Sequence, residues 1–259
     1  MIAIKDLKKS LVSRGSANAF ELDIPCFDIS AEEVIFCVGP NGAGKSTFLA
    51  LLQGLMAPDS GTIHYREKGS TTPFDLLALA PHQRARYLGI VPQEPGGILV
   101  EDMSILDHVL ARLAMSNNIS WFFPKRSCRC RSEKLLATLK LGLDGRANEP
   151  VGNLSSGERQ AIAVLLATMG RPGILLFDEF TASLDPEMSV VLSKRAFEFI
   201  RKDKLSAIFV THRYSEAIEF ADRIIVLYKG TIYQILKRGS QEFSEANLLK
   251  IITELYLTK

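Results

Sequence analysis

The chain has 259 residues, of which 47% are hydrophobic and 23% are charged, and its formal net charge is +2. This composition excludes global disorder, and the near balance of charge argues against nucleic-acid binding through bulk charge. The longest apolar stretch, residues 161–169, is far shorter than the roughly 20 residues that span a bilayer. Four cysteines do not make a disulfide scaffold, and the first residues lack the layout of a signal peptide. We therefore expect a cytoplasmic chain with reduced thiols.

Short apolar segments alternate with helical patterns, which predicts an α/β fold with a largely parallel sheet. The first segment, residues 20–24, alternates apolar and polar side chains and predicts a strand in a half-exposed sheet. Other segments are continuously apolar, as strands buried on both faces are: residues 34–38, 174–177, 207–210 and 224–227.

Capping residues and a turn mark the elements of the second half of the chain. Asp185 is suited to cap a helix whose first position is Pro186, and Ser244 is suited to cap the last helix. Residues 224–228 and 231–235 flank a Lys-Gly pair and predict a hairpin.

The middle of the chain has a different pattern. No strand is predicted between residues 94 and 153, and residues 105–115 and 133–141 have helical patterns. We interpret residues 94–153 as a helical subdomain inserted into an α/β core, whose two parts are residues 1–93 and 154–259.

A predicted loop between the two inserted helices combines aromatic residues at 121–123 with a basic cluster. Its members are Lys125, Arg126, Arg129, Arg131 and Lys134. Contact with anionic lipid headgroups, contact with nucleic acid and a merely solvated loop are all open interpretations. Cys128 and Cys130 are one residue short of a CxxC spacing and have no second pair, so we expect no metal site there.

Residues 39–47 read Gly-Pro-Asn-Gly-Ala-Gly-Lys-Ser-Thr and lie between an apolar segment and a helical pattern. Motif and context match the P-loop, in which glycines let successive N–H groups point at phosphate oxygens and the helix terminus adds favourable partial charge. Lys45 would reach the β- and γ-phosphates, and the Ser46 hydroxyl would bind Mg²⁺. We therefore expect ATP and Mg²⁺ as ligands, with phosphate contacts from Gly39, Pro40, Asn41, Gly42, Ala43, Gly44, Lys45, Ser46 and Thr47.

Polar residues follow three further core strands, at the sheet edge where ligands of open α/β sheets bind. Asp178 is suited to hold Mg²⁺, usually through a water, and Glu179 is placed to polarise an attacking water. His212 would hydrogen-bond the γ-phosphate or orient that water. Gln93, at the border of the core and the insert, would touch the metal and the water and report on the position of the insert.

Residues 154–160 read Leu-Ser-Ser-Gly-Glu-Arg-Gln and open a helix that Ser155 or Ser156 can cap. The free N–H groups at this terminus form a second anion site, which a chain with a P-loop does not need for its own ATP. The segment resembles the signature motif of ABC ATPases, which contacts the γ-phosphate of the ATP bound to the opposing subunit.

The resemblance covers nearly the whole chain, because motifs occur in the family's order and at its usual spacing. Residues 39–47 resemble Walker A, Gln93 the Q-loop, 154–160 the signature, 174–179 Walker B, 183–185 the D-loop, and His212 the switch histidine. It implies a P-loop NTPase of the ABC class, with a mixed sheet core and an inserted helical subdomain. It also implies a head-to-tail homodimer or heterodimer around two ATP molecules, with Ser155, Gly157 and Asp185 among the nucleotide contacts.

The resemblance further implies an ATP hydrolase that drives a transporter. ATP closes the dimer, water attacks in line, and the dimer reopens, with Glu179 as base, Lys45 and Mg²⁺ stabilising charge, and Gln93 and His212 orienting the reactants. Gln93 and the insert would dock on a separate membrane permease at the cytoplasmic face of the inner membrane, where the chain is peripheral.

Residues 82–89 and 155–169 look most like those of prokaryotic uptake systems that use an extracytoplasmic substrate-binding protein, an indirect partner here. The expected work is therefore solute import, with amino-acid or sugar-like solutes nearest. The alternative is a soluble ABC ATPase of an assembly machine, as in iron–sulfur cluster biogenesis.

Two features depart from the family pattern. The signature usually reads Leu-Ser-Gly-Gly-Gln, whereas here Ser156 replaces a Gly and Glu158 replaces the Gln. We expect Glu158 to place a negative charge near the dimer interface and to weaken its closure. The family also usually stacks an aromatic on adenine, but residues 8–16 contain none; Leu11 is the best match and would pack on the base by dispersion.

Overall fold

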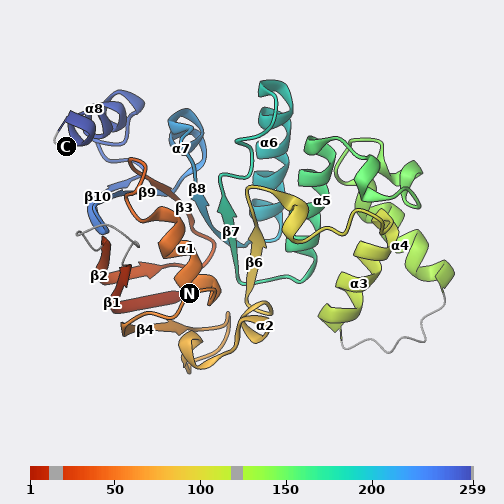
Figure 1. Cartoon of the computed structure of the whole chain (residues 1–259), viewed down its shortest axis with the longest axis horizontal. Coiled ribbons are helices and arrows are strands. Elements are labelled where there is room, and N and C mark those ends of the chain that lie inside the picture. Colours follow the sequence, from red (N-terminus) through yellow and green to blue (C-terminus); the bar gives the residue numbers. More distant parts are fainter. Residues whose placement is uncertain (12–19, 118–124, 258–259) are drawn as a thin grey trace.

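A computed structural model of the chain describes residues 1–11, 20–117 and 125–257. Figure 1 shows the strands β1, β2 and β4 at the lower left, close to helix α1 (Lys45–Gln53). Helix α8 lies at the upper left, and α6, α5, α3 and α4 follow toward the right. Within the described ranges no helix combines the length and the apolar character needed to cross a membrane.

The larger sheet has the order β10-β9-β3-β8-β7-β6 and is parallel except where β10 pairs antiparallel with β9. Its strands confirm the predicted apolar segments and the predicted hairpin. Their bounds are β3 (Val34–Val38), β6 (Leu88–Val91), β7 (Ile174–Asp178), β8 (Ser206–Val210), β9 (Arg223–Tyr228) and β10 (Thr231–Lys237).

The smaller sheet is antiparallel and has the order β2-β1-β4-β5. Its strands are β1 (Ile2–Leu11), β2 (Phe20–Ile29), β4 (Ser60–Tyr65) and β5 (Phe74–Asp75). Only the start of β2 was predicted. In β1 the alternation breaks where Asp6 has a φ of 49° and the pairing with β4 shifts register, so the buried residues Ile2, Ile4 and Leu7 do not follow a period of two.

Alternate residues of the larger sheet pack into two separate cores. Ile35 and Ile208 face α1 and the smaller sheet, whereas Phe36 and Phe209 face the other helices. These helices are α5 (Ser156–Met169), α6 (Pro186–Lys202), α7 (Tyr214–Phe220) and α8 (Glu245–Leu257), and the short elements α2 (Pro81–Arg84) and η1 (Leu76–Ala78) lie after the smaller sheet. The continuous apolar strands are therefore covered on both faces, as predicted.

The predicted caps are present. The Asp185 carboxylate accepts a hydrogen bond of 2.8 Å from the Met188 N–H, and the Ser244 hydroxyl accepts one of 3.3 Å from the Asn247 N–H. On the face of the larger sheet that α5 and α6 cover, the Phe177 and Phe209 rings stack with centroids 4.1 Å apart. This packing fixes the two strands just before the polar residues at their carboxyl ends.

The described residues between 94 and 153 form helices and no strand. They are α3 (Ile105–Asn117), α4 (Lys125–Ala137) and the single turns η2 (Pro95–Gly97), η3 (Leu143–Arg146) and η4 (Val151–Asn153). Figure 1 shows this part extending from the core beyond α5.

The second inserted helix begins earlier in the chain than predicted, at a position where a loop was expected. α4 begins at Lys125 and ends at Ala137, whereas the prediction placed a basic loop through residue 134 and a helix over 133–141. The basic residues in this stretch therefore lie on a helix. Residues 121–123, and the side chains of Lys125, Arg126, Arg129 and Arg131, lie outside the described part of the structure.

Candidate nucleotide-binding and hydrolysis site

The candidate site lies where neighbouring strands end at one edge of the larger sheet. β3, β8 and β7 are adjacent and parallel, and Val210 is in register with both Cys37 and Asp178. The P-loop leaves β3, the acidic pair ends β7, and His212 follows β8, so the sheet brings three of the predicted motifs together. The Glu179 N–H donates to the Val210 carbonyl at 2.9 Å and joins two of these strand ends.

Glycine is required where the P-loop touches its surroundings. Gly39 has a φ of 151°, and a Cβ there would lie 2.2 Å from the Leu227 carbonyl oxygen. Gly44 has a φ of 103° and is the N-cap of α1, without a side chain to bind the first N–H groups of that helix. No N-cap side chain therefore occupies these amides, which leaves them available to an anion.

The Lys45 side chain is buried and curls into this loop. Its Nζ donates to the Gly39 carbonyl at 2.8 Å and to the Pro40 carbonyl at 3.1 Å. Burial lowers the pKa of Lys45, and the nearby carboxylates of Glu179 and Asp178 oppose that shift. Ser46 is exposed on the first turn of α1.

Glu179 and His212 are in direct contact. The His212 Nε2 lies 3.0 Å from the Glu179 Oε1, at the side of an open cleft of about 350 Å³ that both residues line. Glu179 has a φ of 42°, a left-handed conformation that non-glycine residues adopt at a cost and that is frequent at functional sites. The imidazole thus fixes the direction of the carboxylate, which remains open to solvent on its other side.

Asp178 is half-buried beside this pair. Burial raises the pKa of Asp178, the neighbouring Glu179 raises it further, and Lys45 opposes both effects. Two carboxylates and one ammonium thus share a small region at the sheet edge, and a cation close to Asp178 would favour its ionised form.

Gln93 is exposed just after β6, the strand next to β7. Its neighbour Pro92 accepts a hydrogen bond of 2.8 Å from the Nε2 of Gln160, which is only 1% exposed on α5. Gln160 was not among the predicted site residues. Its role was indicated only by the position of an amide side chain among the apolar residues of a buried helix face.

The signature residues form the start of α5, and the carboxylate of Glu158 is not free there. The Ser155 hydroxyl accepts a hydrogen bond of 3.3 Å from the Glu158 N–H, and the Glu158 carboxylate accepts one of 2.9 Å from the Ser155 N–H. Arg146 donates a hydrogen bond to the same carboxylate. The negative charge predicted at Glu158 is therefore present, and it is paired with Arg146.

The signature lies against the first turn of α6, the helix that follows the D-loop. A Cβ on Gly157 would lie 2.5 Å from the Cγ of Met188, which is in the first turn that Asp185 caps. α5 packs on the face of the larger sheet opposite to α1. The chain therefore presents its signature and its P-loop on different sides of the sheet.

Leu11 is half-buried at the end of β1, in register with Phe20 at the start of β2. The Phe20 ring approaches the P-loop, because its Cζ would lie 2.8 Å from a Cβ on Gly44. Phe20 lies beyond residues 8–16, where an aromatic residue was expected, and was not predicted to be near the P-loop. Residues 12–16 of this segment lie outside the described part of the structure.

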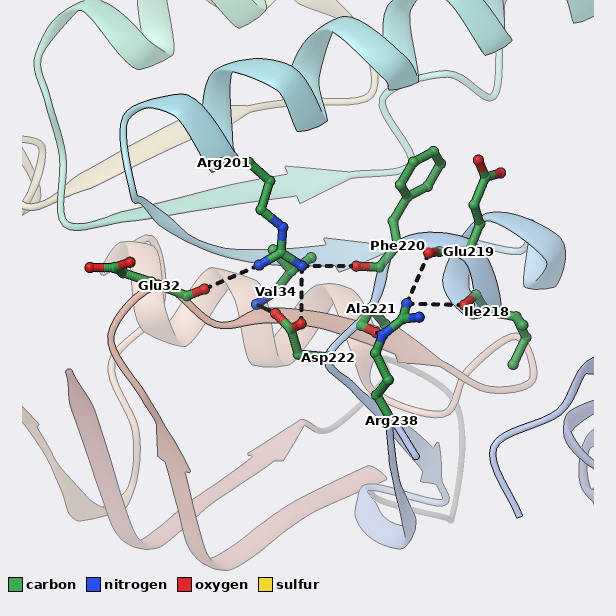
Figure 2. A network of polar contacts seen from close by, with 9 residues as sticks. All are labelled: Glu32, Val34, Arg201, Ile218, Glu219, Phe220, Ala221, Asp222 and Arg238. Carbon is green, nitrogen blue, oxygen red and sulfur yellow. Dashed lines mark hydrogen bonds and ion pairs between the residues drawn. The ribbon is translucent and has the colours of Figure 1, made fainter. Parts of the chain in front are cut away.

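The helix that follows His212 is held at its far end, as Figure 2 shows. The Arg238 guanidinium donates to three carbonyls at the end of α7, the shortest at 2.6 Å. Asp222 accepts a hydrogen bond of 2.8 Å from the Val34 N–H and one of 3.0 Å from Arg201. These contacts satisfy carbonyls that a helix terminus leaves unpaired and fix α7 to the start of β3 and the end of α6.

Comparison with known proteins identifies the family. The family model described as ABC transporter matches residues 22–182. The chain belongs to the ABC transporter family. It is similar to a xylose/arabinose import ATP-binding protein of Sulfolobus acidocaldarius, with 32% identity over 100% of this chain and 96% of that protein. It is also similar to a tyrosine transport ATP-binding protein of Clostridioides difficile, with 29% identity over 93% and 94% of the two chains.

Solved structures confirm the fold class of this ABC ATPase. A dimeric ATP-binding cassette in a post-hydrolysis state with ADP and phosphate has a TM-score of 0.77 and 24% identity over 93% of this chain and 100% of that one. A second cassette, in its ADP conformation, has a TM-score of 0.77 and 20% identity over 100% and 98% of the chains. These structures confirm the predicted P-loop fold with an inserted helical part. The match to the ABC transporter family confirms the predicted ATPase.

Proposed function

We propose that this chain binds Mg·ATP at the edge formed by β3, β7 and β8, and that its hydrolysis powers solute import through a separate membrane permease. The observation that carries the assignment of the reacting groups is the 3.0 Å contact between Glu179 and His212, beside a P-loop whose Lys45 is buried. A carboxylate oriented by an imidazole and open on one side is suited to receive a proton from water.

In the proposed reaction, the P-loop amides and Lys45 hold the phosphates of ATP. Water attacks the γ-phosphorus, the new O–P bond forms, and the bond from phosphorus to the bridging oxygen of ADP breaks, so the electron pair leaves with ADP. Glu179 takes the proton of the attacking water. His212 keeps the Glu179 carboxylate in place, and Gln93 approaches the water from the neighbouring strand.

The donor atoms near the P-loop fit Mg²⁺. The exposed hydroxyl of Ser46 and the carboxylate of Asp178 are hard oxygen ligands, and Mg²⁺ keeps several waters, so it needs only one or two protein ligands. Ser46 and Gln93 would hold the ion directly and Asp178 through a water, and the ion would neutralise phosphate charge.

The second proposed element is a head-to-tail dimer. Ser155 and Gly157 would contact the γ-phosphate of the ATP in the opposing subunit, Asp185 would lie at the same interface, and Leu11 would pack on the adenine. The packing of the signature helix α5 and the P-loop helix α1 on opposite faces of the larger sheet supports an assembly in which a second chain supplies the signature.

The proposed permease contact lies next to Gln93. Ile98 and Val100 are large apolar residues that are 41% and 55% exposed just after it. Import is supported by the names of relatives, which include import proteins for xylose/arabinose and for phosphonates. The chain would then act at the cytoplasmic face of the cell membrane, with an extracytoplasmic substrate-binding protein as an indirect partner.

Site-specific crosslinking in the native host tests this function. We expect Ile98→Cys, treated with a short thiol-reactive crosslinker, to join the chain to an integral membrane protein with several spans, identified by mass spectrometry. Leu55→Cys is the matched control, because Leu55 is 73% exposed at the end of α1. Crosslinking of Ile98→Cys to a soluble scaffold protein alone would contradict the transport role and favour an assembly ATPase.

A further inference from the structure

Arg146 connects the end of the inserted helical part to the signature. It lies in η3 and makes a two-point contact with Glu149, with its Nε 2.7 Å from one carboxylate oxygen and its Nη2 3.0 Å from the other. The Nη1 group of Arg146, which Glu149 does not contact, donates a hydrogen bond to Oε1 of Glu158. Glu149 thus orients the guanidinium group so that its third nitrogen donates to Glu158.

Both oxygens of Glu158 are engaged. Oε2 accepts from the Ser155 N–H at 2.9 Å, and Oε1 accepts from Arg146, while the Glu158 side chain is only 18% exposed. Burial alone would raise the pKa of Glu158, but the hydrogen bonds from Ser155 and Arg146 lower it on balance. A negative charge therefore lies in the first turn of α5, where the Glu158 carboxylate contacts the start of its own helix.

This charge matters for the proposed dimer, because it lies where the phosphate of the opposing subunit would bind. The positive end of a helix dipole favours an anion, but a carboxylate in the first turn already uses that potential and repels a second anion. The other charged pair nearby, Arg159 with Glu101, is longer at 3.9 Å, and Glu101 is largely exposed. Among the described residues, Arg146 is the cation in hydrogen-bond contact with Glu158.

We propose that Arg146 is a positioning residue for the signature, which offsets the charge of Glu158 and so allows the start of α5 to accept the γ-phosphate of the opposing subunit. The proposal rests on the head-to-tail dimer of the proposed function. It makes Arg146 and Glu158 a matched pair, in which the arginine compensates for the acidic residue that replaces the usual glutamine of the signature.

The pair can be tested in the hydrolysis-deficient background Glu179→Gln, by sedimentation velocity with Mg·ATP at several protein concentrations. We expect Arg146→Ala to raise the concentration for half-maximal dimerisation about tenfold, which is within the range of charge effects at helix termini. We expect the double variant Arg146→Ala/Glu158→Gln to restore dimerisation, because the amide still accepts the Ser155 N–H but carries no charge. Added salt should also reduce the Arg146→Ala defect.

A purely structural role for Arg146, as a tie between η3 and α5, gives different results. The double variant also lacks the tie, so it would stay as defective as Arg146→Ala, and salt would not help. Glu149→Gln separates the two roles further. If Arg146 acts by charge compensation, this variant should dimerise as well as its parent or better. If Arg146 acts by tying η3 to α5, the variant should dimerise less well. Failure of the double variant to recover would overturn the proposal.

The same series separates this proposal from the dimer on which it rests. If Glu179→Gln alone binds ATP but stays monomeric at all protein concentrations, the proposed dimer is wrong and the role of Arg146 is wrong with it. If Glu179→Gln dimerises and Arg146→Ala dimerises equally well, the dimer stands and the role of Arg146 is overturned. Binding of ATP by each monomer, measured by equilibrium dialysis, should be equal throughout, since the P-loop lies on the other side of the sheet.

Discussion

Replacement of Gln160 by Leu should uncouple the Q-loop from the signature helix. Leu has a similar volume and stays apolar on the buried face of α5, but it cannot donate the 2.8 Å hydrogen bond to the Pro92 carbonyl. Because Pro92 precedes Gln93, the segment that carries Gln93 loses its link to α5. We expect a several-fold lower kcat with an unchanged Kd for ATP, because Lys45 and the P-loop do not contact this bond.

The effect of this change on stability follows from one partly buried hydrogen bond. A typical bond of this kind contributes about 1 kcal/mol, and a buried acceptor left without a partner costs about 1–3 kcal/mol. We therefore expect Gln160→Leu to lower the free energy of unfolding by about 1–2 kcal/mol. For a chain of this size, that corresponds to a Tm lower by roughly 2–8 °C.

Thr168→Val is the matched control. Thr168 is also buried on α5, and its hydroxyl donates to the Leu165 carbonyl of its own helix at 2.8 Å, so it makes no link to the Q-loop. Phosphate release and thermal unfolding would be measured for both variants. A kcat for Gln160→Leu equal to that of Thr168→Val, at a similar loss of Tm, would refute the link between Gln160 and Gln93.

Two further predictions concern ATP binding. Lys45→Ala should abolish hydrolysis and weaken ATP binding, because it removes the side-chain cation of the P-loop, and hydrolysis near the wild-type rate would contradict the assignment. Leu11→Tyr should tighten ATP binding by about 0.5–1.5 kcal/mol, as a new aromatic contact would, and an unchanged Kd in calorimetry would show that Leu11 does not lie on the base. Binding of inorganic tripolyphosphate should not change in Leu11→Tyr, because that ligand has no base.

Much of the core and of the catalytic edge could be predicted from the sequence, because both depend on local patterns. The strands buried on both faces are continuous apolar segments, and the polar residues after them occupy one sheet edge whenever the strands are parallel. Glu179 and His212 are examples: each follows such a strand, and the structure places them 3.0 Å apart.

The remainder depends on irregular or distant pairings. β1 was missed because the positive φ of Asp6 interrupts its alternation. Gln160 and Pro92 are 68 positions apart, and the bond between them appears only when α5 packs against β6. The charge of Glu158 was predicted, but its partner Arg146 lies 12 positions away in η3, so no local pattern indicated the pairing. The start of α4 was taken as a loop because its basic composition gives little apolar periodicity.

The most direct test of the proposed mechanism is the rate of phosphate release by Glu179→Gln, with ATP affinity measured on the same preparation. The amide keeps the volume and one oxygen of the side chain, but it cannot accept a proton at neutral pH. We predict that turnover falls by roughly 10²–10⁴-fold, the usual contribution of a general base, while the Kd for ATP stays nearly constant. Turnover close to the wild-type rate would show that Glu179 is not the base.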